Sequence, residues 1–177
     1  MVAQPGFIQV YTGNGKGKTT AAFGLALRAA GWGMRTYVAQ FLKKWETGEI
    51  LSIAKHLSDF IRVEQFGLPE FHLPGSGIRP EERAEALKGL NASRAAMISG
   101  SFQMIILDEI NVLLHFKILK EEPVLRLLEQ KPKNVELVLT GRNAPKSILK
   151  KADLITEMKE IRHYFSQGCP ARTGFEQ

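Results

Sequence analysis

The sequence predicts an α/β fold with a predominantly parallel six-stranded sheet flanked by helices, formed as a single domain over residues 1–177. Short apolar segments rich in β-branched residues alternate with helical segments, as in parallel strands joined by crossover helices. A glycine-rich loop joins the first apolar segment to the first helical one, and a later apolar segment ends in two acidic residues. No internal repeat, low-complexity tract or domain linker interrupts this order.

We expect strands at six short apolar segments: residues 7–11, 36–41, 61–66, 104–107, 137–140 and 154–158. Between them we expect helices over residues 19–30, 80–100, 123–128 and 145–151. The second of these helices begins at Pro80, because proline suits the first turn of a helix and the two glutamates after it suit the positive helix N-terminus. Pro123 and Pro145 are taken to begin the third and fourth helices in the same way.

The glycine-rich loop reads Gly-Asn-Gly-Lys-Gly-Lys-Thr-Thr and has the composition of a triphosphate-binding loop. Small residues let backbone N–H groups turn toward anionic oxygens, Lys18 supplies a positive charge, and the Thr19 hydroxyl can join the coordination shell of Mg²⁺. A plain turn is the alternative, but its lysines would repel each other without an anion. Position 12 holds Thr12, where the usual spacing has its first glycine. The candidate nucleotide ligands are Gly13, Asn14, Gly15, Lys16, Gly17, Lys18, Thr19 and Thr20.

An acidic pair, Asp108 and Glu109, follows the fourth expected strand. Carboxylates that emerge from a buried strand beside a phosphate loop supply oxygen ligands for Mg²⁺ or Mn²⁺, whereas the alternative is that they cap the next helix. Arg142 follows the fifth strand, where its guanidinium can reach phosphate oxygens or pair with a surface carboxylate. Together with the loop, these positions predict a P-loop NTPase-like, RecA-like fold. No Asn-Lys-x-Asp segment for guanine is present, so ATP is the expected nucleotide.

Composition and charge narrow the function classes. The net charge of +6 and the pI near 9.5 favour anionic ligands. Lysines and arginines are dispersed among acids and are not interleaved with aromatic residues, so we expect no nucleic-acid partner. We expect no membrane contact and a cytoplasmic protein, because the chain has no signal-peptide pattern and no apolar stretch of about 20 residues. The single cysteine, Cys169, cannot form an internal disulfide.

Three motifs and the C-terminal sequence resemble the ATP:corrinoid adenosyltransferases of the bacterial cobalamin pathway. The motifs are GNGKGKTTAAFG at residues 13–24, Leu-Asp-Glu at 107–109 and Thr-Gly-Arg at 140–142. The ending over residues 162–176 resembles the family's ending, which has a basic residue and His, then Gly, Ala and Gly-Ile-Glu. The resemblance covers nearly the whole chain.

The resemblance implies a reaction at carbon rather than at phosphorus. In that family, a corrinoid reduced to Co(I) attacks the 5′ carbon of the ribose of ATP, forms a cobalt–carbon bond and expels triphosphate. ATP sits in the loop in the opposite sense to that in other P-loop enzymes. An electron donor for the reduction of Co(II) to Co(I) and a homodimer are also implied.

The resemblance assigns roles to individual residues. Lys18 and Glu109 are the expected catalytic residues, with Lys18 and Lys16 serving the departing triphosphate. Thr19 and Glu109 are expected to bind Mg²⁺, with Asp108 as a further metal candidate. Three further residues are expected at the nucleotide: Asn14 near its sugar, Arg142 near its phosphates, and Arg28, which falls on a family arginine but stands nine residues beyond Thr19 on the helix.

The corrinoid is expected near residues 67–79, a segment rich in Gly, Ser and Pro that follows the third strand. Family members use aromatic residues there to exclude the lower axial ligand of cobalt. Phe71 fits this pattern, and Leu73 stands where a tryptophan is often found. Phe66 and Trp45 are other candidates, for which core packing is the alternative. His163 matches the family's tail and is expected in the framework of the site.

Two other enzyme classes remain as alternatives. A small-molecule kinase would use the same phosphate loop, but its lid usually carries clustered arginines, and the sequence has no such cluster. A RecA-like ATPase that binds nucleic acid would need a surface of interleaved basic and aromatic residues.

Overall fold

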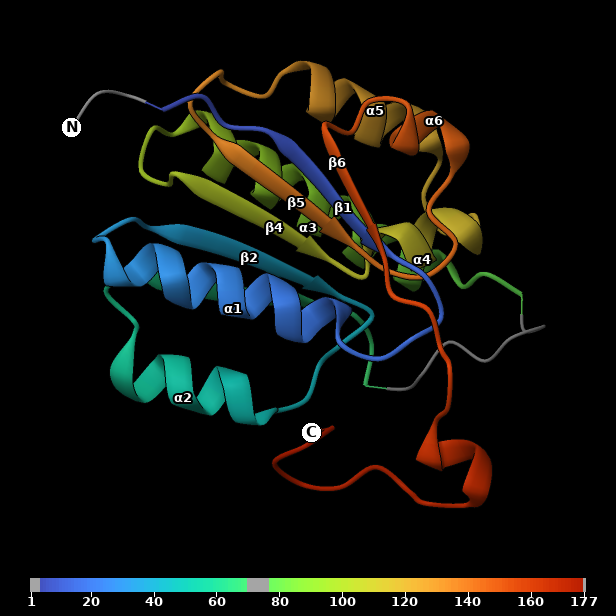
Figure 1. Ribbon diagram of the computed structural model, residues 1–177. Coiled ribbons are helices and arrows are strands. Elements are labelled where there is room, and N and C mark those ends of the chain that lie inside the picture. The colour runs from blue at the N-terminus through green and yellow to red at the C-terminus, as the bar shows by residue number, and fades with distance from the viewer. Residues whose placement is uncertain (1–3, 70–76, 177) are drawn as a thin grey trace.

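A computed structural model describes residues 4–69 and 77–176 (Figure 1). Its centre is a six-stranded sheet in the order β3-β2-β4-β5-β1-β6, in which every recorded strand pair is parallel. The strands are β1 Ile8–Thr12, β2 Thr36–Phe41, β3 Ile61–Phe66, β4 Met104–Asp108, β5 Glu136–Thr140 and β6 Leu154–Glu157. The predicted fold class is confirmed, and each predicted strand lies within one residue of the observed bounds.

Helices cover both faces of the sheet. They are α1 Lys18–Gly31, α2 Gly48–His56, α3 Pro80–Ile98, α4 Ile110–His115, α5 Glu121–Glu129 and α6 Lys146–Leu149, and a 3₁₀ turn, η1, spans Tyr164–Gln167. The first two helices lie on one face and the other four on the opposite face (Figure 1). Within the described residues, no helix combines the length and the apolar character that crossing a bilayer requires.

Alternate side chains of the central strands build two separate cores. On β2, Val38 belongs to the core beneath α1, whereas Tyr37, Ala39 and Phe41 belong to the core beneath α3. The whole of β2 is therefore buried, as expected for a parallel strand covered on both faces. Phe66 also packs in the second core, with its ring centroid 6.1 Å from that of Phe41.

The helix start assigned at Pro80 is confirmed, because α3 begins there, but the starts assigned at Pro123 and Pro145 need correction. α5 begins at Glu121, two residues ahead of Pro123, because a proline fits anywhere in the first turn, where backbone N–H groups have no partner within the helix. Pro145 precedes α6 as its N-cap, and this helix is a single turn that ends at Leu149. α2 was not predicted, although Ile50, Ile53, Ala54 and Leu57 recur at helical spacing in the sequence. Ile53 is the one residue of this helix that is buried.

Candidate functional site

The glycine-rich loop joins β1 to α1, as predicted. Its first glycine is at position 13 because Thr12 still belongs to β1, where it pairs with Glu157. Gly13 has φ of +92°, and a Cβ atom there would lie 2.5 Å from the carbonyl oxygen of Met158. The Gly15 N–H donates to the same carbonyl at 2.7 Å. The loop therefore packs directly against the chain after β6, and only glycine fits its first position.

Lys18 lies at the start of α1 with its ammonium enclosed by the loop. Its Nζ donates to the carbonyl oxygens of Gly13 at 2.8 Å and Gly15 at 2.7 Å. Burial lowers the pKa of Lys18, while the negative charge of Glu109 acts in the opposite direction. The first turn of α1 carries no acidic residue. A helix N-terminus that presents N–H groups beside a lysine attracts an anion.

Asp108 is fully buried at the end of β4 and accepts four side-chain hydrogen bonds. Its Oδ1 accepts from the hydroxyls of Thr19 at 2.9 Å and Thr140 at 2.7 Å. Its Oδ2 accepts from Gln40 at 3.2 Å and Lys43 at 3.0 Å. Thr140 ends β5, the strand between β1 and β4, and its hydroxyl joins the end of β5 to the end of β4. The four donors occupy the roughly four acceptor positions of a carboxylate.

Glu109 is half-buried and lines the cavity in front of Asp108. Its φ of +66° is unusual for a residue with a side chain, and its N–H donates to Thr140 Oγ1 at 2.9 Å. It precedes α4, but its side chain makes no capping hydrogen bond to that helix. Burial, and then the charge of Asp108, raise the pKa of Glu109, while Lys43 and Lys18 oppose that rise. A cation bound at this carboxylate would stabilise its ionised form against both burial and the charge of Asp108.

The donor set fits a magnesium ion. The proton of the Thr19 hydroxyl is directed to Asp108, so the lone pairs of its oxygen remain available, and Glu109 offers a carboxylate beside it. Among residues 4–69 and 77–176, no group of three or more His, Cys, Asp or Glu side chains could hold a metal ion alone. Two protein oxygens suit Mg²⁺, which usually completes its shell with phosphate oxygens and water.

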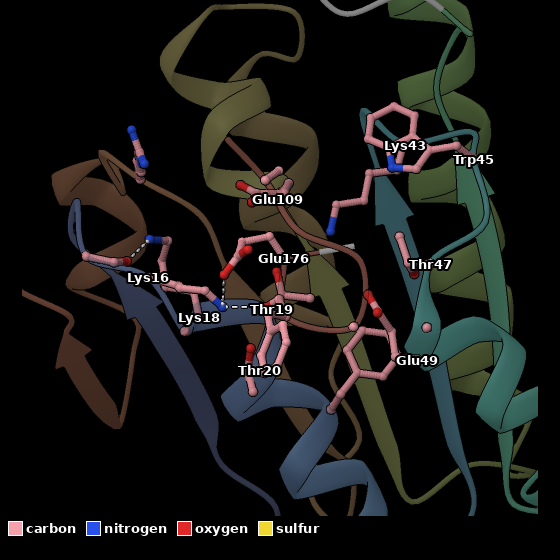
Figure 2. A pocket seen from close by; sticks show the side chains of 18 of the residues that line it. Lys16, Lys18, Thr19, Thr20, Lys43, Trp45, Thr47, Glu49, Glu109 and Glu176 are labelled. Atoms are coloured by element: carbon pink, nitrogen blue, oxygen red, sulfur yellow. Dashed lines mark hydrogen bonds and ion pairs between the residues drawn. The ribbon is translucent and has the colours of Figure 1, made fainter. Parts of the chain in front are cut away.

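These groups line a cavity of about 940 Å³ (Figure 2). Of the predicted site residues, nine line it: Gly15, Lys16, Gly17, Lys18, Thr19, Thr20, Glu109, Arg142 and His163. Gly13 and Asp108 lie behind the wall, where they bond to Lys18 and Thr19. Asn14 and Arg28 are exposed and do not line the cavity, and Arg28 is in the last turn of α1. Phe71 and Leu73 lie outside the described residues.

The loop after β2 and the start of α2 form a wall that the sequence analysis largely missed. Lys43, Thr47 and Glu49 line the cavity there, together with Trp45, which had been considered as a corrinoid contact. The rule that selected Arg142, a cation just after a parallel strand, also selects Lys43. Lys43 itself stands in no recognised motif.

The C-terminal segment, residues 163–176, forms a further wall. The Lys16 ammonium donates to the carbonyl oxygen of Phe175 at 2.7 Å and lies 3.8 Å from Glu176. Glu176 in turn accepts hydrogen bonds from Arg172 and from the Tyr164 hydroxyl, and these bonds lower the pKa of Glu176 to about 2. Phe175 and Glu176 line the same cavity as Gly48 and Glu49 at the start of α2, and Figure 1 shows the tail running toward that helix. The tail thus closes the cavity on the side of the loop lysine.

The family model for ATP:corrinoid adenosyltransferase BtuR/CobO/CobP matches residues 4–177. A corrinoid adenosyltransferase of a Sinorhizobium species is 37% identical over 181 residues, covering 98% of this chain and 81% of the relative. One from Escherichia coli K12 is 33% identical over 178 residues, covering 97% and 85%. The solved structure of a KaiC-like protein from Pyrococcus horikoshii OT3 has a TM-score of 0.60 at 16% identity, covering 89% of this chain and 75% of that one. This last likeness shows the fold.

Proposed function

The chain belongs to the ATP:corrinoid adenosyltransferase family, and we propose that it transfers the 5′-deoxyadenosyl group of ATP to the Co(I) centre of a reduced corrinoid. The observation that carries this proposal is the cationic loop at the start of α1, which lines a cavity of about 940 Å³ together with two further walls of the site. Such a cavity has the size of a small-molecule site and leaves room beside a triphosphate.

The reaction needs positioning and charge stabilisation more than a base. Co(I) is the nucleophile and attacks C5′ of the ribose. The cobalt–carbon bond forms, the C5′–O bond breaks, and its electron pair leaves with the triphosphate, so that cobalt passes formally from Co(I) to Co(III). Lys18 and Lys16 stabilise the negative charge on the departing group, and the loop holds the phosphates in place.

We assign Thr19 and Glu109 as the residues that hold Mg²⁺, or Mn²⁺ in its place. Bound there, the ion would supply positive charge that offsets the negative charge of the phosphates. Asp108 then serves as the acceptor that orients the Thr19 hydroxyl. Its four hydrogen bonds and complete burial favour this role over direct coordination.

The remaining assignments are proposals that rest on the family and on position. Arg142 lines the cavity and is assigned to the phosphates, and His163 is assigned to the framework of the corrinoid side. Asn14 is assigned to the sugar. Arg28, at the far end of α1, is the weakest member of the nucleotide set, since it does not line the cavity.

The corrinoid side and the wider setting are also proposals. Phe71 and Leu73 are proposed to contact the corrinoid, as the family pattern implies for the segment after β3. We further propose a separate electron donor, a homodimer and a cytoplasmic location. A single-domain organisation over residues 1–177 is proposed as well.

The decisive experiment is a phosphorus NMR spectrum of the protein with ATP, Mg²⁺ and a chemically reduced corrinoid. Intact triphosphate, formed in equal amount to alkylated corrinoid, is the expected product. A spectrum that contains only ADP and inorganic phosphate would overturn the proposal in favour of the kinase or ATPase alternatives, which family membership does not favour. The control omits the corrinoid and should leave ATP unchanged.

A further inference from the structure

Lys43 places a third lysine in the cavity, on the wall after β2 that faces the glycine-rich loop. Its side chain is 18% exposed, and its Nζ donates to Asp108 Oδ2 at 3.0 Å. Figure 2 shows the side chain reaching from this wall into the cavity toward the side that holds Glu109. Most lysines keep the ammonium in water, so a largely buried one that points inward calls for a reason.

The backbone around Lys43 is shaped to hold it there. Leu42 has φ of +59°, a conformation that costs a branched residue energy, and its N–H donates to the carbonyl oxygen of Phe66 at 2.9 Å. Gly67 lies against the same turn, and a Cβ atom at this position would be 2.7 Å from the backbone nitrogen of Lys43. Strain of this kind persists where the surrounding structure enforces it, commonly at functional sites.

Neutralisation of Asp108 does not use the whole ammonium group. Asp108 already accepts hydrogen bonds from Thr19, Thr140 and Gln40. A lysine ammonium carries three N–H donors. Within residues 4–69 and 77–176, the hydrogen bond recorded for Lys43 Nζ is the one to Asp108. Two donors therefore remain for a ligand in the cavity that Lys43 lines.

The position of Lys43 matches a phosphate bound at the start of α1. Thr19 in the first turn of that helix donates to one oxygen of Asp108 at 2.9 Å, and Lys43 donates to the other at 3.0 Å. The hydroxyl that we assign to Mg²⁺ and the ammonium of Lys43 are thus separated by a single carboxylate. An anion at the N-terminus of α1 would have Lys18 on one side and Lys43 on the other.

We propose that Lys43 is a third lysine of the triphosphate site, which donates hydrogen bonds to phosphate oxygens of ATP and to the triphosphate as the C5′–O bond breaks. This inference rests on the proposed function. The hydrogen bond to Asp108 holds the Lys43 ammonium in its orientation toward the cavity. Lys43 therefore belongs to the phosphate site.

The test measures equilibrium binding of tripolyphosphate by calorimetry, with and without Mg²⁺, to the full-length protein. Lys43→Met removes the charge and keeps a chain of similar length. We expect its dissociation constant to rise by about ten- to a hundredfold, as for loss of a hydrogen bond to a charged group. The matched control is Lys44→Met at the neighbouring, exposed lysine, which should bind as the wild type does.

Lys18→Ala, measured in parallel, separates this inference from the proposed function. If Lys18→Ala loses affinity and a folded Lys43→Met variant keeps it, Lys43 only balances Asp108, and the inference is overturned while the proposed function stands. If both variants bind like the wild type, the loop does not hold triphosphate, and both proposals are overturned. Loss in both variants, with an unchanged Lys44→Met control, supports both.

A second measurement uses the wild-type protein and does not depend on how a variant folds. Lysines are acetylated briefly with and without tripolyphosphate, and labelling at each position is followed by mass spectrometry. We expect tripolyphosphate to slow acetylation of Lys43 and to leave Lys44 unchanged. Equal labelling of Lys43 in both conditions, at a tripolyphosphate concentration that saturates the protein, would overturn the inference.

Discussion

Two walls of the same cavity are built in opposite ways. On the wall formed by the ends of β1, β4 and β5, Asp108 and Thr140 have no exposed surface. The partners of Asp108 come from α1, from β2 and the turn after it, and from β5. The tail wall over residues 163–176 contains no buried residue in its 3₁₀ turn. It is held by polar contacts at Tyr164, Arg172 and Lys16.

This contrast suits two different requirements: the wall around Asp108 has to stay rigid, and the tail wall has to open. The leaving group is best stabilised by charges that do not reorganise as the reaction proceeds, and a buried network provides such charges. A substrate the size of a corrinoid must enter and a product must leave, and weak surface contacts allow this. Substitutions in the first wall should therefore change chemistry or stability, whereas substitutions in the tail should change closure.

The largest effect is expected for Lys18→Ala, which removes the charge at the centre of the rigid wall. The developing charge on the triphosphate loses a preorganised partner, which is worth about 2–4 kcal/mol, or roughly 30- to 1000-fold in kcat. The measurement is the rate of adenosylation of pre-reduced Co(I) corrinoid at saturating ATP. Turnover like that of the wild type would remove Lys18 from the catalytic residues and would leave the two walls without a functional difference.

A smaller effect on rate is expected for Glu109→Gln, about tenfold or more, because the amide is a poorer ligand for Mg²⁺. The Mg²⁺ concentration for half-maximal ATP binding should rise. The metal-free variant should be no less stable than the wild type, because burial and the charge of Asp108 both disfavour the ionised carboxylate and raise its pKa. A chelator-treated thermal melt measures this, and a marked drop in Tm would show that Glu109 is structural.

Thr140→Val tests whether the rigid wall owes its order to the bridge between β4 and β5. The substitution leaves a buried oxygen of Asp108 and the N–H of Glu109 without the hydroxyl that now bonds to both. We expect a loss of about 1–3 kcal/mol in the free energy of unfolding, measured with urea. Thr156→Val, on the exposed strand β6, is the control and should change stability little. Similar losses of stability in both variants would show that the hydrogen bonds of the Thr140 hydroxyl do not stabilise this wall more than an exposed threonine does.

The sequence predicted the rigid wall better than the others for a physical reason. Lys18 and Thr19 lie in one contiguous motif, and Asp108 ends a strand whose apolar run is unmistakable. Lys43 meets Asp108 across 65 residues of sequence, because β2 pairs with β4. No local pattern records that pairing.

The tail could be predicted only as a match to a family ending. Its contacts with Lys16 depend on where the chain turns after β6, and an exposed 3₁₀ turn leaves no periodic apolar pattern. Of the short helices, which each bury a single residue, α2 was missed and α6 was predicted too long. The positions of the strands along the chain and of the glycine-rich loop could be predicted, because apolar runs and glycines mark them in the sequence.

The smallest effect is expected for Tyr164→Phe, which removes from the tail one hydroxyl that bonds to Glu176. The Arg172 guanidinium carbon lies 4.9 Å from the centroid of the aromatic ring at position 164, and the substitution leaves this contact in place. The tail therefore keeps one of the contacts that hold it. We expect kcat to change by no more than about threefold, since single exposed contacts contribute little. Carboxypeptidase should nevertheless remove the carboxyl-terminal residues faster in the variant, because the enzyme cleaves the tail only when it is released from the cavity. If Tyr164→Phe lowers kcat as far as Lys18→Ala does, the tail is as much a part of the catalytic wall as the loop, and the division between a rigid and an opening side fails.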